Sequence, residues 1–230
     1  MSFPYPRLEG QISYRLADGG ARGREWFSIH RHPGGRTVRA MCEMDAEALI
    51  RDTSWSLDPQ WRPVEGHVRV TLKGVLAGST WYAIDGNVCR CRALTATHGH
   101  VDQVLTSASP FLFLGLHPLI GDGLLAAACG LEQPGIERTI NAVTCSYSPN
   151  GERELLALPI AIGVTYVGGE RLTVPAGEFE AHKFAVRWRP EWPPADYWVF
   201  GEDFVFLKST WSVSQLTCSL ESFRTIVANA

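Results

Sequence analysis

The sequence predicts a mainly β protein, in which one large, curved antiparallel sheet folds toward a half-barrel around a short central helical segment. Three observations support this fold class. Apolar and polar residues alternate through most of the first hundred positions, turn-forming residues separate the alternating runs, and the same pattern returns in the last third of the chain. Because no stretch resembles a flexible linker, the 230 residues are expected to form a single domain, 1–230.

Five alternating runs predict a meander of antiparallel strands, since consecutive strands joined by short turns pair with their neighbours. The turns "HPGGR" and "AIDGNV" support this interpretation, because Gly-Gly and Asp-Gly accept the positive φ that tight hairpins require. The runs are residues 24–32, 37–44, 67–76, 79–85 and 87–94.

Three segments are expected to depart from this pattern. Residues 45–52, "DAEALIRD", carry helix formers and predict a short helix or a loop. Residues 57–66, "LDPQWRPVEG", contain two prolines that cannot donate to a ladder, so we expect them to wrap an edge. In the apolar stretch 111–130, Ala and Leu predict a helix over Gly123–Cys129 with Asp122 as its N-cap.

Strands return in the last third of the chain, where "VPAG" and "FGED" supply the turns. The expected strand regions are 162–174, 177–188, 195–212 and 214–226.

The C-terminal strands contain one short, distinctive pattern. It consists of the turn Val174–Gly177, the Phe-Glu-Ala strand at Phe179–Ala181, and an aromatic strand with Tyr197 and Trp198. This pattern resembles the closing strands of a bacterial family of unknown function, the DUF3108-like proteins. The resemblance implies a β-rich cup related to lipoprotein-carrier folds.

Composition and charge are typical of an ordinary globular protein. With 45% hydrophobic residues, 20% charged residues and a net charge of -3, the chain has no basic stripe that predicts a nucleic-acid partner. The longest apolar run, 111–119, is too short to span a bilayer, and the N-terminus shows no signal peptide. We therefore expect a cytoplasmic protein without a membrane partner, although many DUF3108-like proteins are exported. A homodimer is compatible with these features.

No cofactor and no metal are expected. The chain has no phosphate-cradling Gly-rich loop before a helix, no His-Glu-x-x-His and no Gly-x-Ser-x-Gly. The six cysteines are scattered, and Cys89 with Cys91, on one strand face, lack a second pair to complete a zinc site. Two His-x-His pairs would bind a metal only if another ligand converged on them, so exposed strand-end histidines are the main interpretation. The pairs are His30 with His32 and His98 with His100.

Arginines in the strands are candidate anchors for a carboxylate, because a guanidinium that faces into a cup is costly to desolvate unless it meets an anion. In "TVRAMCEM", Arg39, Met41 and Glu43 share one face, whereas the opposite face is uniformly apolar and is the better core candidate. Arg39 and Glu43 therefore line either solvent or a ligand cup. Arg69 is a further candidate of the same kind.

Eight tryptophans are many for this length. Large rings with a polar handle suit walls that stack on a flat apolar ligand, although packing of a large sheet explains most of them equally well. The candidate ligand-binding tryptophans are Trp81, Trp188 and Trp211.

His117 and Asp122 lie in the most apolar segment of the chain. Pro118 and the flanking glycines could bend this segment so that both side chains project into one cavity, where His117 would act as a general acid or base oriented by the carboxylate. The structural alternative is a buried histidine bonded to a backbone carbonyl and an aspartate that caps a helix.

Three functions follow from these candidates. The first is a cofactor-independent lyase or isomerase, such as a decarboxylase in aromatic-compound catabolism, that acts on an apolar or aromatic carboxylic acid. In it, His117 and Tyr82 would transfer protons, and Arg39 or Arg69 would bind the carboxylate. The second is a non-catalytic carrier of a hydrophobic ligand, as the family resemblance implies. The third, a metal-dependent enzyme, depends only on the His-x-His pairs.

Overall fold

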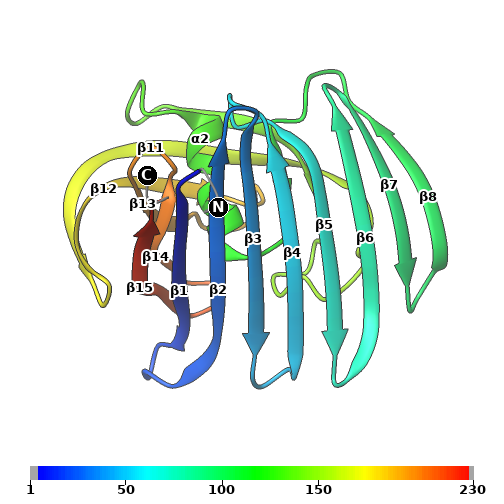
Figure 1. The fold of residues 1–230 in the computed structure, drawn as a ribbon, viewed down its shortest axis with the longest axis horizontal. Helices are drawn as coiled ribbons and strands as arrows, with labels where there is room; N and C mark the ends of the chain where they lie inside the picture. The colour runs from blue at the N-terminus through cyan, green and yellow to red at the C-terminus, as the bar shows by residue number, and fades with distance from the viewer. Residues whose placement is uncertain (1–4, 228–230) are drawn as a thin grey trace.

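The computed structural model describes residues 5–227, which form one continuous sheet of 15 strands. In its first half each strand pairs antiparallel with the next along the chain (Figure 1), as the alternation predicts. These strands are β1 Arg7–Leu16, β2 Ala21–His32, β3 Gly35–Met44, β4 Leu49–Leu57, β5 Pro63–Leu72, β6 Val75–Asp85, β7 Val88–Thr95 and β8 Gly99–Thr106.

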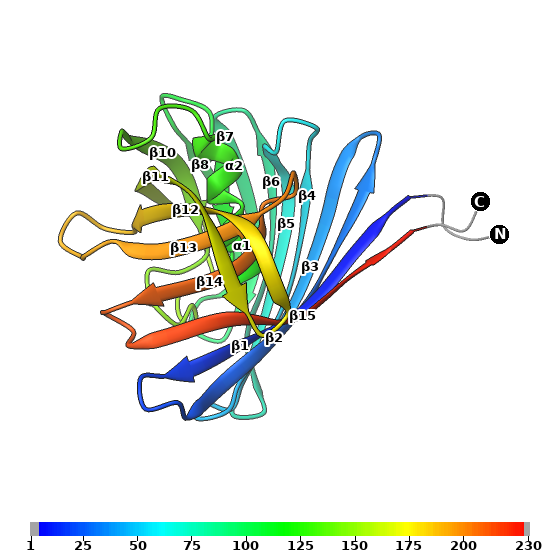
Figure 2. The same cartoon turned by 90° about the vertical axis from the view of Figure 1, so that its left-hand side faces the viewer.

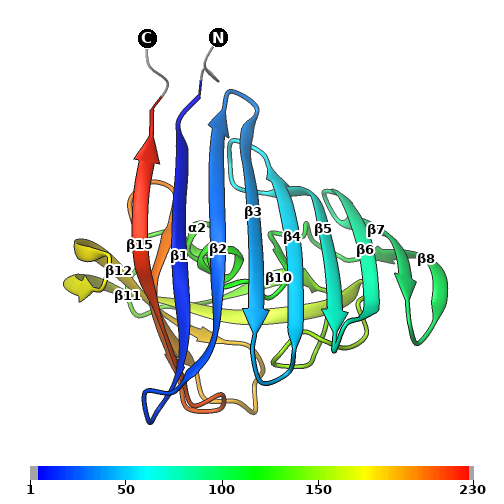
Figure 3. The same ribbon diagram turned by 60° about the horizontal axis from the view of Figure 1, so that its bottom comes forward.

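A second set of strands continues the same sheet. These are β9 Phe113–Gly115, β10 Glu137–Thr144, β11 Leu158–Val174, β12 Gly177–Arg187, β13 Ala195–Phe200, β14 Val205–Trp211 and β15 Leu216–Ile226. All of them pair antiparallel except β9, which is parallel to β10. The two halves join where β15 pairs with β1 (Figure 3), so β8 and β9 form the two edges of the sheet.

The sheet curls so that its second half crosses its first. Figure 1 shows β11 running behind β2 to β6, across the strand direction. Two short helices, α1 Leu119–Gly123 and α2 Leu125–Cys129, lie within the curl (Figure 2). α1 contacts β13 and β14, and its Gly121 lies against the Trp55 ring of β4, so the helices fill the space between the two halves. The half-barrel around a central helical segment is confirmed. Within residues 5–227, neither helix has the length and apolar character needed to cross a bilayer.

The prediction that Asp122 caps the central helix is wrong. The helical segment begins four residues earlier than expected, at Leu119, and its N-cap residue, Pro118, has no side-chain cap. The carboxylate of Glu25 on β2 accepts the backbone N–H groups of Leu119 at 2.8 Å and Ile120 at 3.0 Å instead. A group distant in sequence thus satisfies the unpaired donors of the first turn, and Asp122 lies inside α1.

Several other segments differ from expectation. Residues 45–48 form a turn, and the chain then enters β4, so the short helix or loop predicted over 45–52 is replaced by a strand for half its length. Residues 58–62 connect β4 and β5 in the middle of the sheet and do not wrap an edge. The run 67–76 contains the hairpin between β5 and β6, with Lys73 and Gly74 at positive φ. β1, β4, β8, β9 and β10 were not predicted.

The two faces of the sheet separate as the alternation predicts. Val38, Ala40 and Cys42 are buried on the inner face, whereas Arg39 and Met41 are exposed on the outer face. All six cysteines are buried free thiols. Their burial agrees with the structural role expected for the Cys-x-Cys pair of β7.

The chain between β10 and β11 closes the curl against the first half of the sheet. The Thr80 hydroxyl and the Tyr82 hydroxyl of β6 donate to the carbonyl oxygens of Leu155 and Leu156, at 2.6 Å and 3.0 Å. On β8, the Gln103 side-chain amide donates to the backbone carbonyl of Ala157 and accepts from its backbone N–H. These bonds satisfy backbone groups of an irregular segment that would otherwise be costly to bury.

Candidate functional site

An inner cavity of about 130 Å³ lies among the C-terminal strands, the start of α1 and the adjoining loops. Aromatic and polar side chains line it together, the combination expected of a small-molecule site. Its aromatic residues are Tyr14, Tyr147, Trp188, Trp192, Tyr197 and Trp211. Its polar residues include His117, Asp122, Thr144, Ser146 and Ser209. The structure therefore brings the predicted residues His117, Asp122, Trp188 and Trp211 to one cavity.

Asp122 presents a carboxyl to this cavity in an environment that opposes its ionisation. Burial raises its pKa well above the usual range, and the nearby Glu25 carboxylate raises it further. The charge of Arg51 and one hydrogen bond, donated by the Tyr197 hydroxyl at 3.3 Å, act in the opposite direction. Within residues 5–227 this hydroxyl is the one hydrogen-bond donor to the carboxyl, so the carboxyl has capacity for another partner.

Glu25 is fully buried and well supplied with donors. Besides the two N–H groups of α1, it accepts from the Tyr14 hydroxyl at 2.6 Å and from the Cys42 thiol at 3.4 Å. Burial raises the Glu25 pKa, although these bonds lower it. Its contacts fix α1 against β2 and so place Asp122 at the cavity.

Arg51 is a buried guanidinium on the inner face of β4, where it donates to the backbone carbonyl of Asn150. In the described part of the chain it forms no ion pair, and its buried Nε has no hydrogen-bond partner. Its hydrogen bond anchors the loop that follows β10. Its positive charge also reaches the side chains around the cavity, as the pKa shifts of Asp122 and His117 show.

His117 is held at a left-handed backbone position, with φ of 77°. Its Nε2 lies 3.3 Å from the Ser146 carbonyl oxygen. A carbonyl only accepts, so Nε2 carries the proton and Nδ1 is an acceptor. Burial and the Arg51 charge lower the His117 pKa to about 3, which keeps the ring neutral near pH 7. Gly151 faces this ring so closely that a Cβ there would collide with it.

The mouth of the cavity is rich in packed rings. Trp188 stacks edge-on against Tyr197 with centroids 6.3 Å apart, and Trp192 packs against Trp211 at 5.3 Å. The Arg189 guanidinium lies 5.1 Å from the centroids of Tyr147 and Trp192, and it also forms an ion pair with Glu191 at 3.6 Å. The rim therefore already accommodates one cation against its aromatic faces.

Tyr82, the expected second proton-transfer group, does not line this cavity. It is fully buried on β6, and its hydroxyl donates to Leu156. Burial raises its pKa well above the usual range. The structure therefore gives Tyr82 a role in closing the curl and does not assemble it with His117.

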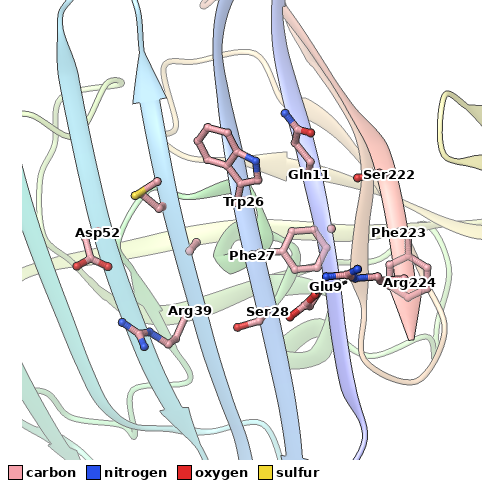
Figure 4. A pocket seen from close by; sticks show the side chains of 13 residues that line it. Glu9, Gln11, Trp26, Phe27, Ser28, Arg39, Asp52, Ser222, Phe223 and Arg224 are labelled. Carbon is pink, nitrogen blue, oxygen red and sulfur yellow. Dashed lines mark hydrogen bonds and ion pairs between the residues drawn. The ribbon is translucent and has the colours of Figure 1, made fainter. Parts of the chain in front are cut away.

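Arg39 lines a different hollow, an outer groove of about 750 Å³ over β15, β1, β2, β3 and β4, and Arg69 pairs with Asp52, which also lines this groove. Figure 4 shows Arg39 between Asp52 and Ser28, with Trp26 further along the same face. The Asp52 carboxylate accepts from Arg69 at 2.9 Å, whereas Arg39 has no ion pair or hydrogen bond among residues 5–227.

Two further candidates also lie on the outer face. Glu43 is paired with Arg24 at 2.6 Å. The exposed Trp81 donates its Nε1–H to Glu65 at 2.7 Å. Because the sheet separates Arg39, Arg69, Glu43 and Trp81 from His117 and Asp122, these residues cannot form one substrate site. This corrects the expectation that the arginines bind a carboxylate beside His117.

The His-x-His pairs lie at or near strand ends, as expected. Across the described residues, no three His, Cys, Asp or Glu side chains are grouped so that they could hold a metal ion. One pair lies near the end of β2, and the other spans the turn from β7 to β8.

Sequence reasoning missed Glu25, Arg51, Tyr197 and Trp192. Two of them carried a signal, because Glu25 lies two positions before the inward Phe27, and Arg51 lies two positions after the inward Leu49. A charged residue at an inward position of a strand is costly unless it has a structural or binding role. This rule would have identified both.

Comparisons with known proteins define the fold only. No family model matches the chain, and no curated protein matches its sequence, so membership of the DUF3108-like family stays a prediction. Among solved structures, the chain is similar to a β-barrel-like protein of the domain of unknown function DUF1849 from Brucella abortus, with 8% identity, 99% of each chain covered and a TM-score of 0.57. A DUF1089 family protein from Pseudomonas aeruginosa has 12% identity, with 80% of this chain and 87% of that chain covered and a TM-score of 0.48.

Proposed function

We propose that this protein is a non-catalytic binding protein that holds one small ligand with an apolar or aromatic body in the inner cavity. The observation that carries this proposal is the meeting of tryptophan and tyrosine rings with buried polar groups in one cavity. The rings supply apolar contact area, and the few polar groups fix the orientation of the ligand. The carrier-like cup implied by the DUF3108-like resemblance agrees with this function.

Binding is favoured over the lyase or isomerase for three reasons. Tyr82 is absent from the residues that line the cavity, and the candidate arginines lie on the outer face. A histidine whose pKa is about 3 is also a weak general base near neutral pH, because a general base works best when its pKa is close to the operating pH. The cavity therefore has groups that recognise a ligand without a matched pair that transfers protons.

Isothermal titration calorimetry with the neutral, single-ring probe phenol tests the proposal, because a cavity of about 130 Å³ is close in size to one that holds benzene. We expect the heat of binding to saturate with the wild-type protein. Trp188→Ala should weaken probe binding about tenfold, which corresponds to roughly 1.4 kcal/mol of lost ring contact. The matched control is Trp81→Ala, which removes an exposed ring from the outer face and should leave binding unchanged. Absence of saturable binding, or equal losses in the two variants, would refute an inner ligand site.

A further inference from the structure

We propose that the inner cavity selects a ligand that carries an organic ammonium group, held between the Asp122 carboxylate and the rings of Trp188 and Tyr197. This inference rests on the proposed binding function and names the chemical class of the ligand. Three features of the cavity support it: its charge balance, its hydrogen-bonding groups and its walls.

Arg189 also lines the cavity, but its charge is compensated by its ion pair with Glu191, and the interior groups that remain are more acidic than basic. Glu25 and Asp122 are two carboxyl groups, Arg51 is one guanidinium, and no ion pair joins any of them within residues 5–227. His117 adds no positive charge near neutral pH. Two ionised carboxylates would therefore leave one negative charge uncompensated, a costly state inside a protein. In the empty cavity a proton supplies the missing positive charge, and an ammonium group can replace it.

The lone pairs and the carboxyl that face the cavity favour a positively charged ligand over an anionic one. Asp122 receives one hydrogen bond, from Tyr197, and retains acceptor capacity. The His117 Nδ1 is a further acceptor, because Nε2 carries the proton toward Ser146. Thr144 directs its hydroxyl hydrogen to backbone carbonyls, so it too is already used as a donor. Around Asp122 and His117 a carboxylate ligand would meet lone pairs that repel it, whereas the positive charge of an ammonium group complements them, with or without an N–H.

The walls are suited to an alkylated cation. Aromatic faces attract ammonium groups through their quadrupoles, and quaternary ammonium ligands are typically bound in such cages. The volume of about 130 Å³ is close to the roughly 150 Å³ of an apolar cavity that holds benzene, so a trimethylammonium head fits. Arg189 lies over the Tyr147 and Trp192 rings, so the rings that remain for a ligand near Asp122 are Tyr197, which bonds to it, and Trp188, which packs against Tyr197.

Ligand binding is coupled to a proton. An ammonium group favours ionised Asp122, so binding should release a proton and strengthen as the pH rises. The groups that act on Asp122 come from several elements. They are Glu25 of β2, Arg51 of β4, Cys145 just after β10, Tyr197 of β13 and Cys218 of β15.

Isothermal titration calorimetry with choline and 3,3-dimethyl-1-butanol tests the inference, because the second compound is the neutral isostere with carbon in place of nitrogen. We expect choline to bind at least about tenfold more tightly to the wild type. Asp122→Asn should bring the two affinities to within about twofold, while Asp52→Asn, on the outer face, should preserve the difference. In buffers of different ionisation enthalpy, the choline titration should show proton release for the wild type and none for Asp122→Asn.

A second variant covers the case in which Asp122→Asn fails to fold. Trp188→Leu keeps an apolar side chain but removes the ring. It should weaken the affinity for choline about fivefold and change the affinity for 3,3-dimethyl-1-butanol by less than about twofold. Equal affinities in the wild type, or saturable binding of the phenol probe without binding of choline, would overturn the inference and leave the binding function standing. Loss of probe binding as well would overturn both.

Discussion

Charged residues on the inner face of the β2 to β5 region have different partners from those on its outer face. On the outer face, Arg24 pairs with Glu43 at 2.6 Å, and Arg69 pairs with Asp52 at 2.9 Å, all within reach of water. The inner-face charges, on Glu25 and Arg51, form no ion pair in the described part of the chain and bond instead to backbone groups of distant segments. The difference shows that the inner charges position a helix and a loop, whereas the outer charges form ion pairs at the solvent-exposed surface.

The largest effect is expected from Glu25→Ala. The change leaves two N–H groups of α1 and the Tyr14 hydroxyl without their acceptor in a buried site. Each unsatisfied group costs about 1–3 kcal/mol, so the free energy of unfolding should fall by at least about 3 kcal/mol. Urea denaturation followed by tryptophan fluorescence measures it.

The outer-face control for that change is Glu43→Ala. It breaks an exposed ion pair and should cost less than about 1 kcal/mol. Similar losses in the two alanine variants would remove the distinction between the faces.

A second test compares buried and exposed histidines through pH. Because the His117 pKa is lowered to about 3 in the folded protein, the unfolded chain binds a proton first as the pH falls. The stability that His117 contributes is present above about pH 6.5 and is lost below it, by about 2 kcal/mol between pH 7 and pH 5. Denaturation of wild type and His117→Gln over this range should show the difference.

The exposed His100 provides the control for the pH series. His100→Gln should follow the wild type at every pH, because this side chain lies at the solvent-facing start of β8. A His117→Gln variant whose stability changes with pH in parallel with the wild type would contradict the assignment of a desolvated, neutral His117.

The smallest effect is expected from Arg69→Gln. The residue is exposed, and its partner Asp52 remains hydrated after the change. The free energy of unfolding should change by less than about 0.5 kcal/mol, and the difference should shrink further in high salt. Thermal unfolding at two salt concentrations measures it. A loss of 2 kcal/mol or more in the free energy of unfolding would mean that this outer-face ion pair has a structural role comparable to that of the inner-face charges.

Much of the fold could be predicted because strand alternation and turn residues are local signals. β1 was not predicted because its inward-facing residues include Gly10, which interrupts the apolar pattern. A Cβ there would lie 2.6 Å from the Phe27 ring, so the neighbouring strand requires the absence of a side chain. β9 has only three residues, too few for a period to be recognised.

The site was only partly predictable, because it depends on pairings between distant segments. His117 and Asp122 share a cavity, as proposed from the bend-forming residues between them. The cap of α1 could not be deduced, since Glu25 is 94 residues from Leu119. Nor could parity alone decide what covers each face of the Arg39 strand, because alternation separates two faces without stating which one encloses a cavity.

The pairing of β1 with β15 also has a kinetic consequence. Ser13 lies 208 residues from Glu221, to which its hydroxyl donates, and this seam alone joins the two meanders into one sheet. Until β15 has been synthesised, β1 offers an unpaired edge, and the hairpins of the first half can form well before the seam closes. Such long-range pairing slows folding and leaves partly folded chains prone to edge-to-edge association. Among the strands described, β15 is made after all the others, and its pairing therefore protects the exposed edge of β1.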